Sequence, residues 1–321
     1  MGNQFRRLGL WVGALTLVVG MFVFYQMSST AHLRTLAVDT GQLRVHLSQL
    51  VNERYTDLAL ARTRAYLMQQ LQAYGYEPIL QPFGSGESTG TNLSVIRPGS
   101  QDLDHKILVG AHYDSVQGSP GADDNASAVV AALEIARIFA DYPTDKTLQV
   151  VFFDQEELQP EGAGLLGSNA FVGEAPNLEG LDGAVILEML GYACYEPGCQ
   201  NYPAGLEQDG FPDIGDFIGV IGDAEHPDLL AAFNVVDEGG LEAVTLSVPV
   251  GALPFMPDLF RSDHVPFWLK NVGAVMVSDT ANFRNPNYHR DSDTLESLDL
   301  EFLEETTQYV VDRVEKLLSV S

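Results

Sequence analysis

The chain has 321 residues, of which 45% are hydrophobic and 30 are glycine, a composition typical of a folded globular protein. Its 17 lysines and arginines stand against 44 aspartates and glutamates, which gives a formal net charge of −27. This balance argues against a nucleic-acid-binding protein, because such a protein needs a basic face. The acidity is typical of a solvated surface that favours solubility.

The first 27 residues differ from the rest of the chain. Residues 8–25 are apolar, without charge or proline, and are about long enough to cross a bilayer as a helix. Arg6 and Arg7 precede them and predict a cytoplasmic N-terminus. We therefore expect residues 1–27 to be a cytoplasmic stub and a transmembrane signal-anchor. A cleaved signal peptide is the alternative, because the small residues 29–31 resemble a cleavage site. Either interpretation exports the remainder to the periplasm or the extracellular space, anchored in the first case and secreted in the second.

The remaining chain is predicted to hold a linker, residues 28–40, and one domain, residues 41–321. Apolar residues at three- and four-residue spacing predict two helices within residues 41–78. Strands are then expected at residues 91–98, 104–114, 148–157, 182–190, 216–222, 242–250 and 273–280, and helices at 125–140, 164–172, 225–237 and 298–320. Apolar strands that alternate with helices favour an α/β domain with a central mixed, mostly parallel β-sheet flanked by helices.

The two cysteines, Cys194 and Cys199, are close in sequence and enclose a Pro197-Gly198 turn. In an exported protein such a pair is expected to form a short-loop disulfide. Two metal-binding thiols are the alternative, but the chain has no other cysteine to complete such a site.

Histidine and carboxylate side chains follow several predicted strands. They are His112, Asp114, Glu156, Glu157 and Glu188, with Tyr288, His289 and Asp293 in the loop after the last strand and Asp124 at the start of a helix. In open α/β sheets, ligands bind outside the carboxyl ends of the strands, so we expect these side chains to meet at one rim. Histidine nitrogens and carboxylate oxygens are zinc ligands, and two zinc ions can share a carboxylate and a water.

Six segments resemble motifs of the zinc-dependent M28 peptidases, a family that contains bacterial leucine-type aminopeptidases. They occur in the family's order across about residues 105–295 and read GAHYDS (110–115), PGADDNAS (120–127), FFDQEE with GLLGSNAF (152–157 and 164–171), ILEMLGY (186–192), SDHVPFW (262–268) and NPNYHRDSDT (285–294). The resemblance implies a zinc exopeptidase fold and two zinc ions per chain.

The resemblance also implies which residues bind the metal. His112 and Glu188 would bind one zinc, Glu157 and His289 would bind the other, and Asp124 would bridge both. The family often has a cis peptide after this aspartate, here Asp124–Asn125. The chain departs from the family pattern at Glu188, where many members have aspartate. Glutamate still offers an oxygen ligand, although its extra methylene would reshape the floor of the pocket.

The remaining motif residues would act on the substrate or support the ligands. Glu156 would be the general base on the bridging water, and Tyr288 would donate a hydrogen bond to the oxyanion. Asp114 would hold the His112 ring, while Asp263 and Asp293 would support the site from behind. His264 is expected to pack rather than bind metal, because two histidines already complete the pattern. The histidines outside the motifs are expected at the surface, namely His32, His46, His105 and His226.

Three functions remain open at this stage. A zinc aminopeptidase acting on peptides is favoured, because the free amine of a peptide would dock near the acidic cluster. A glutaminyl-cyclase-like acyltransferase with a single zinc is the second interpretation, and a non-catalytic binding ectodomain is the third. The same donor types also accept manganese and cobalt.

Overall fold

The computed structural model describes residues 36–85, 88–157, 164–206, 210–234 and 240–320. The expected transmembrane segment, residues 8–25, lies outside the described residues, as does His32. Within the described ranges, none of the helices combines the length and the apolar character that a membrane span requires. Residues 38–321 form one compact unit.

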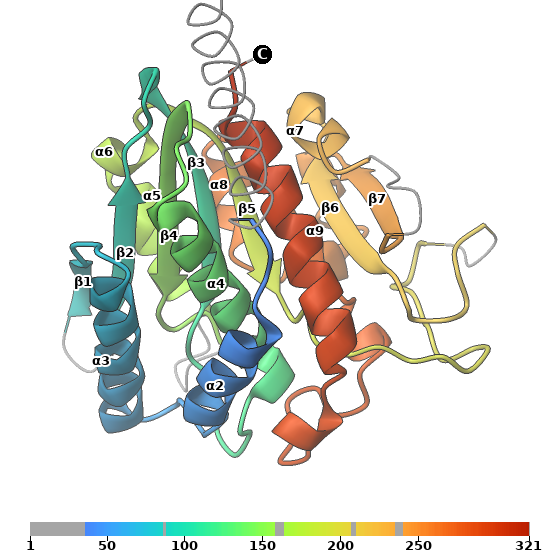
Figure 1. The fold of residues 1–321 in the computed structure, drawn as a ribbon. Coiled ribbons are helices and arrows are strands. Elements are labelled where there is room, and N and C mark those ends of the chain that lie inside the picture. The colour runs from blue at the N-terminus through green and yellow to red at the C-terminus, as the bar shows by residue number, and fades with distance from the viewer. Residues whose placement is uncertain (1–35, 86–87, 158–163, 207–209, 235–239, 321) are drawn as a thin grey trace, which may run out of the picture. The chain divides into compact units, whose positions relative to one another are not determined.

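The unit is built on one eight-stranded sheet in the order β1-β2-β4-β3-β5-β8-β6-β7 (Figure 1). Its strands are β1 (Ile79–Ser85), β2 (Ser88–Arg97), β3 (Asp102–His112), β4 (Lys146–Phe153), β5 (Leu181–Glu188), β6 (Ile218–Asp223), β7 (Ala243–Val248) and β8 (Ala274–Ser278). The central strands β4, β3, β5 and β8 run parallel, while β2 and β6 flank them in antiparallel pairings. The sheet is therefore mixed, as predicted.

Helices cover both faces of the sheet. They are α2 (Thr40–Leu50), α3 (Asp57–Ala73), α4 (Ala128–Ala140), α5 (Leu166–Gly173), α6 (Ala175–Leu178), α7 (Pro227–Ala231), α8 (His264–Leu269) and α9 (Leu300–Leu318). In Figure 1, α2, α3, α4 and α9 lie in front of the sheet, and α5 and α8 lie behind it. The sequence pattern predicts neither the strand β1 nor the short helices α6 and α8, and the helix expected at residues 225–237 is described only at Pro227–Ala231.

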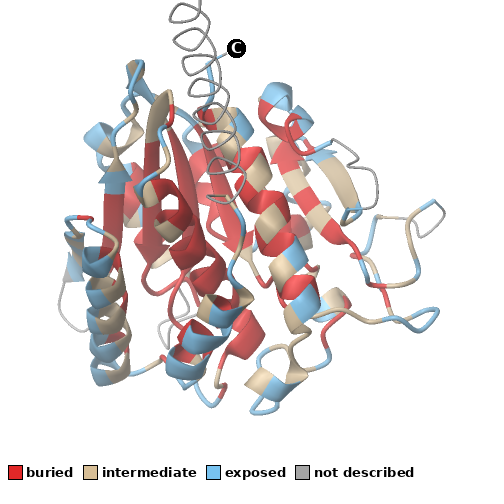
Figure 2. Ribbon diagram, in the orientation of Figure 1, coloured by how far each residue is buried: buried red, intermediate tan, exposed pale blue. Residues whose placement is uncertain are grey.

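The core explains why the central strands read as continuous apolar runs. The last six residues of both β3 and β4 are buried, and α4 is buried along most of its length between the sheet and the outer helices (Figure 2). On the opposite face, Phe153, Phe171 and Phe267 pack together, with Phe153 edge-on to Phe171 at a centroid distance of 5.7 Å. A strand buried on both faces needs apolar side chains in both directions, so alternation disappears.

One expectation about the histidines is wrong. His46 is buried, with only 1% of its surface exposed, rather than lying at the surface. Its ring nitrogens are 2.7 Å from the Tyr66 hydroxyl and 3.0 Å from the Tyr74 hydroxyl, both on or next to α3. A short segment cannot reveal this environment, because it requires α3 to pack beside α2. His105 is exposed beside Asp182, as expected, and His226 is half-buried beside Asp223.

Candidate metal centre and its cavity

Two neighbouring parallel strands bring the first histidine and a carboxylate together. His112 is the last residue of β3 and Glu188 is the last residue of β5, so both project from the same edge of the sheet. The His112 Nε2 atom lies 3.4 Å from the Glu188 Oε1 atom and 3.5 Å from the Asp124 Oδ1 atom. Asp124 reaches this position from the turn Ala122–Ser127, directly before α4, where the backbone is not helical at Asp124 and Asn125.

Asp124 also faces the second histidine. Its Oδ2 atom lies 3.1 Å from the His289 Nε2 atom, which is itself 3.3 Å from the Glu157 Oε2 atom. Each carboxylate oxygen of Asp124 therefore lies near a different histidine. Glu156 lies beside this set, with Oε2 at 4.0 Å from His112 Nε2. The ligand atoms form three tight groups, each with all members within 4.8 Å, and all six side chains belong to at least one group.

Two further aspartates fix the backbone that carries these carboxylates. The Asp114 carboxylate accepts hydrogen bonds from the backbone amides of Glu156 and Glu157, both at 3.1 Å, and its Oδ1 atom lies 3.3 Å from His112 Nδ1. Asp293 accepts in the same way from the amides of Asp123 and Asp124, at 2.9 and 3.1 Å. Each aspartate thus orients a pair of residues rather than one side chain.

Local backbone geometry directs these side chains toward the rim. The Asp124–Asn125 peptide bond is cis, as the resemblance implied. Gly121 directly precedes the turn Ala122–Ser127 and has a φ of 62°. A Cβ atom at this position would collide with the Asp124 carbonyl oxygen. His289 has a φ of 58°, a left-handed conformation that is uncommon for residues other than glycine. The collision that a Cβ atom would cause at Gly121 explains why glycine is required before the turn Ala122–Ser127.

The electrostatics of the cluster call for additional positive charge. Burial, together with the neighbouring Asp124 carboxylate, raises the pKa of Glu157 to about 7. Burial likewise raises the pKa of Glu156 well above its usual range, with Glu157 and Glu188 adding to the effect while His112 opposes it. His289 has a pKa raised to about 10, because its bonds to Asp124 and Glu157 outweigh the cost of burial.

This donor set fits a divalent cation. Carboxylates and imidazoles that hold protons so tightly release them when a cation supplies the balancing charge. The donors are two histidine nitrogens and several carboxylate oxygens, the ligands typical of zinc sites. Four of the six side chains are buried, while Glu188 is half-buried and His289 is exposed. Asp114 lies at the back of the His112 ring, as hydrogen-bonded carboxylates do behind metal-binding histidines.

Three consecutive residues, 261–263, contribute side chains to the site. The contacts made by Arg261 and Ser262 were not predicted from the sequence. The Ser262 hydroxyl donates to Glu188 Oε2 at 2.6 Å, so it holds the longer carboxylate that replaces the family's aspartate. Arg261 donates from Nη2 to the Tyr288 hydroxyl at 2.7 Å. Asp263 is fully buried, and burial raises its pKa to about 7, with Glu188 adding to the effect and His112 opposing it. The motif SDHVPFW marks this segment, but Arg261 lies one residue outside it.

Tyr288 and His264 occupy different positions relative to the cluster. The Tyr288 ring stacks on the His289 ring at a centroid distance of 3.7 Å and lines the same cavity as the carboxylates. His264 points away into the protein, where it is buried at the start of α8. Its ring packs edge-on to Trp268 and its Nε2 atom lies 3.0 Å from the Leu259 carbonyl oxygen. The expectation that His264 packs rather than joins the cluster is confirmed.

A cavity of about 500 Å³ extends from the cluster along the β6–β7 end of the sheet. Asp124, Glu156, Glu157 and Glu188 line one end. Apolar side chains line much of the remainder, including Tyr202, Leu206, Phe211, Val220, Val244 and Met276. The cluster therefore lies at the charged end of a mostly apolar recess, which suits a ligand with one polar and one apolar part.

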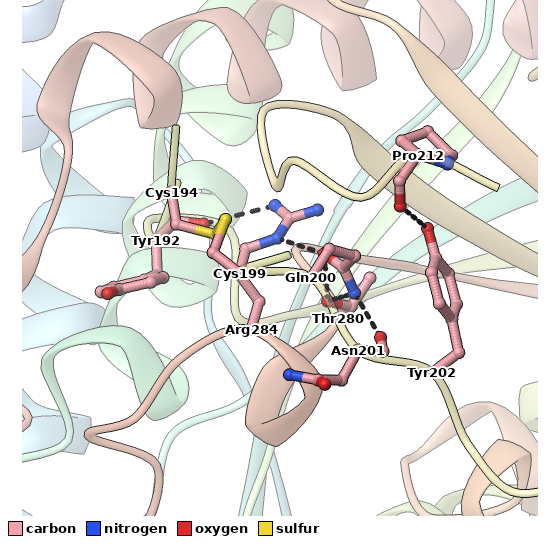
Figure 3. Close-up of a disulfide and its surroundings, with 9 residues drawn as sticks. All are labelled: Tyr192, Cys194, Cys199, Gln200, Asn201, Tyr202, Pro212, Thr280 and Arg284. Carbon is pink, nitrogen blue, oxygen red and sulfur yellow. Dashed lines mark hydrogen bonds between the residues drawn. A yellow bond between two sulfur atoms is a disulfide. The ribbon is translucent and has the colours of Figure 1, made fainter. Parts of the chain in front are cut away.

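The predicted disulfide lies beside one wall of this cavity. Cys194 and Cys199 are bonded, and the next residue, Gln200, is buried and accepts a hydrogen bond from Arg284 Nε at 2.8 Å (Figure 3). Asn201 and Tyr202 follow directly and line the cavity. The sequence predicted the bond but not its position relative to the candidate site.

Comparison with known proteins agrees with this geometry. Residues 92–210 match the family model described as Peptidase family M28. Uncharacterized protein YfbL of Escherichia coli (strain K12) is 35% identical over 214 residues, which cover 64% of this chain and 65% of YfbL. Leupeptin-inactivating enzyme 1 of Streptomyces exfoliatus is 30% identical over 192 residues, covering 53% of this chain and 42% of that enzyme. The chain thus spans less than two thirds of either relative.

Solved structures share the fold. An aminopeptidase from Aneurinibacillus sp. strain AM-1 matches with a TM-score of 0.66 at 16% identity, over 90% of this chain and 96% of its own. A glutaminyl cyclase from Fimbriiglobus ruber matches with a TM-score of 0.62 at 18% identity, over 87% and 95%. A zinc aminopeptidase from Bacillus subtilis matches with a TM-score of 0.52 at 25% identity, over 73% and 51%. One architecture therefore carries both kinds of named enzyme.

Proposed function

This chain is a member of peptidase family M28, and we propose that it acts as a zinc-dependent aminopeptidase that removes apolar N-terminal residues from peptides. The observation that carries the proposal is the convergence of two histidines and four carboxylates at the charged end of an apolar cavity. A peptide has the matching polarity, because its N-terminal amine is cationic and its first side chain can be apolar.

The ligand assignment follows from the distances. Asp124 separates two half-sites, so we propose one zinc held by His112, Glu188 and Asp124 Oδ1, and a second held by His289, Glu157 and Asp124 Oδ2. Bound there, zinc supplies Lewis acidity, which lowers the pKa of a bound water toward 7 and polarises a substrate carbonyl.

The side chains around the half-sites then divide the proton transfers. Glu156 lies beside both groups and is positioned to accept a proton from the attacking water at Oε2 and return it to the leaving amine. Tyr288 accepts a hydrogen bond from Arg261, so its own O–H is left to donate toward the cavity that it lines. A donor in that position stabilises the oxyanion of a tetrahedral intermediate.

The charge of the cavity favours an amine over a carboxylate at the scissile end. Arg261 is the only arginine or lysine among the described residues that line the cavity, and its Nη1 atom already donates to Asp258 at 3.2 Å and Asn282 at 3.0 Å. The Arg261 guanidinium is therefore directed at Tyr288 and Asp258 rather than at a position where a substrate carboxylate could bind. Four cluster carboxylates attract the N-terminal ammonium group instead.

The second candidate is the glutaminyl-cyclase-like acyltransferase, which the fold of the Fimbriiglobus ruber enzyme favours. Its one-zinc chemistry would use only one of the two half-sites. Here His112 and His289 each face a separate carboxylate as well as Asp124, which supports two metals.

The test is metal analysis of the purified full chain together with a substrate panel. Two zinc ions per chain, cleavage of leucyl p-nitroanilide and no cleavage of its N-acetylated form are expected. One zinc per chain with cyclisation of N-terminal glutamine would favour the acyltransferase. A zinc-loaded chain that turns over neither substrate would contradict both enzymatic functions and leave a binding ectodomain.

We also propose that the peptidase domain acts outside the cytoplasm, periplasmic or extracellular, because residues 8–25 are apolar and follow two arginines. Exported peptides would then be its substrates. Protease accessibility in spheroplasts tests this topology, with a cytoplasmic protein as the protected control. Protection of residues 41–321 against added protease would contradict export.

A further inference from the structure

The Cys194–Cys199 disulfide has no part in the chemistry described above, yet it lies where the cavity wall begins. The loop that follows it carries five described side chains that line the cavity: Asn201, Tyr202, Pro203, Leu206 and Phe211. This loop lies between β5 and β6 and contains no strand of the sheet among its described residues. The sheet alone therefore does not hold this wall in place.

The disulfide turn closes the loop at its base. On one side of the turn, Cys194 exchanges two backbone hydrogen bonds with Gly215, both at 2.9 Å. On the other side, the Gly198 and Gln200 amides donate to the Asp213 carbonyl at 2.9 and 3.2 Å. Residues on both sides of the disulfide turn are thus hydrogen-bonded to the returning end of the loop. The disulfide itself fixes the distance between Cys194 and Cys199.

Buried polar contacts extend this hydrogen-bonded network toward the catalytic loop after β8. Gln200 is fully buried, accepts from Arg284 Nε at 2.8 Å and donates to the Thr280 hydroxyl at 3.0 Å (Figure 3). The Asn201 amide donates to the Phe283 carbonyl at 2.8 Å. Packing here is tight, since a Cβ atom on Gly215 would collide with Arg284 and with Cys194 Sγ.

The loop is also held within itself. The Tyr202 and Phe211 rings lie 5.1 Å apart, and the Tyr202 hydroxyl donates to the Pro212 carbonyl at 2.6 Å. These contacts hold Tyr202 and Phe211 together within the loop that the disulfide turn closes. A displaced base would move Tyr202 and Phe211 together, away from β6 and β7 across the cavity.

We propose that the Cys194–Cys199 disulfide is a specificity-determining brace, which holds the wall formed by residues 201–206 and Phe211 at the distance that selects large apolar N-terminal side chains. This role rests on the proposed aminopeptidase function, because it assigns the substrate's first side chain to that wall. The metal ligands lie on β3, β5, the turn Ala122–Ser127, and the loops after β4 and β8, and the disulfide crosslinks none of these segments. The brace therefore changes the KM of substrates whose first side chain reaches the wall.

The test compares the full-length, zinc-loaded wild type with the double variant Cys194→Ser/Cys199→Ser on leucyl and alanyl p-nitroanilides. The leucyl KM is expected to rise about tenfold, while the alanyl KM and both kcat values change less than about twofold, since only the larger side chain contacts the wall. Glu196→Ala, an exposed position in the same turn, is the matched control and is expected to leave both KM values unchanged.

Two further measurements keep the outcome decisive. Amide hydrogen exchange should quicken at Gly198, Gln200 and Gly215 in the double variant, and the zinc content should equal that of the wild type. Wild-type enzyme reduced with dithiothreitol and alkylated with iodoacetamide should reproduce the leucyl effect, which covers the case of a misfolded double variant. An equal loss on both substrates, or an unchanged leucyl KM in both samples, overturns the brace. A zinc-loaded wild type without aminopeptidase activity overturns the proposed function instead.

Discussion

The two ends of the cavity are held by different means. At the charged end, Asp124 and Glu157 are buried, and backbone bonds to Asp293 and Asp114 fix the segments that carry them. At the apolar end, Tyr202 and Phe211 stand on a loop that a disulfide and the buried Gln200 secure. Under the proposed function, strand ends place the chemistry and a loop selects the substrate side chain. Substitutions at the charged end should change turnover and metal content, and those at the apolar end should change substrate preference.

The largest effect is expected for Glu156→Gln. The amide cannot accept the proton of the attacking water, so kcat should fall about 10³- to 10⁴-fold while the zinc content stays unchanged. Steady-state kinetics and metal analysis on the same preparation measure both quantities. Glu179→Gln, at an exposed position, is the control. Retained turnover in Glu156→Gln would refute the assignment of the base.

Tyr288 and Arg261 form one unit, because both line the cavity and Arg261 donates to the Tyr288 hydroxyl. Tyr288→Phe should lower kcat about 10²- to 10³-fold through loss of the oxyanion donor. Arg261→Gln should cost about tenfold, and the double variant should be no slower than Tyr288→Phe alone, since both changes act through one hydroxyl. Kinetics of the four proteins give the coupling. Additive losses would show that Arg261 acts independently of Tyr288.

His264 makes the free energy of unfolding depend on pH. Burial lowers its pKa to about 4, while its ring nitrogen bonds to the carbonyl of Leu259, a residue that lines the cavity. Because the folded pKa lies below the unfolded value of about 6.5, this stabilisation is complete above that pH and is lost as pH falls toward 4. The loss amounts to about 3 kcal/mol of unfolding free energy.

Urea unfolding at several pH values, compared between the wild type and His264→Gln, isolates this contribution from the other acidic groups. The variant should be less dependent on pH between 6.5 and 4, while His105→Gln, an exposed histidine, should follow the wild type. Identical pH profiles for the wild type and His264→Gln would contradict the buried neutral ring.

The smallest effect is expected for Asp114→Asn at the charged end. The asparagine amide group cannot accept both backbone hydrogen bonds that Asp114 receives from Glu156 and Glu157. Zinc affinity should therefore fall about 10- to 100-fold, as for other carboxylates that orient metal ligands. Competition with a zinc chelator measures this, with Asp104→Asn at the exposed part of β3 as control. An unchanged affinity would limit Asp114 to a structural role.

The sequence allowed the central sheet to be predicted because β3, β4 and β5 are buried on both faces and read as apolar runs. It also indicated which side chains would meet, since His112 and Glu188 end adjacent parallel strands. The antiparallel strand β1 escaped prediction because Pro82 and Gly84 interrupt its pattern. The helix α8 escaped because it is short and contains Pro266.

Contacts between loops that are distant in sequence could not be predicted from the sequence pattern. The bond from Ser262 to Glu188 and the bond from Arg261 to Tyr288 join residues whose proximity depends on the whole fold. The burial of His46 and the apolar wall near the disulfide are of the same kind. Periodicity and strand ends report local geometry, whereas these features arise only when separate loops pack together.

The bridging position of Asp124 between His112 and His289 is the central claim, and zinc stoichiometry tests it most directly. The zinc-equilibrated, gel-filtered full chain is measured by plasma mass spectrometry and X-ray absorption, alongside Asp124→Ala and the exposed control Asp216→Asn. We predict two zinc ions per chain, about 3.5–4 Å apart, in the wild type and the control, and loss of zinc in Asp124→Ala. Two zinc ions retained in Asp124→Ala, or a wild type that binds none, would contradict the account.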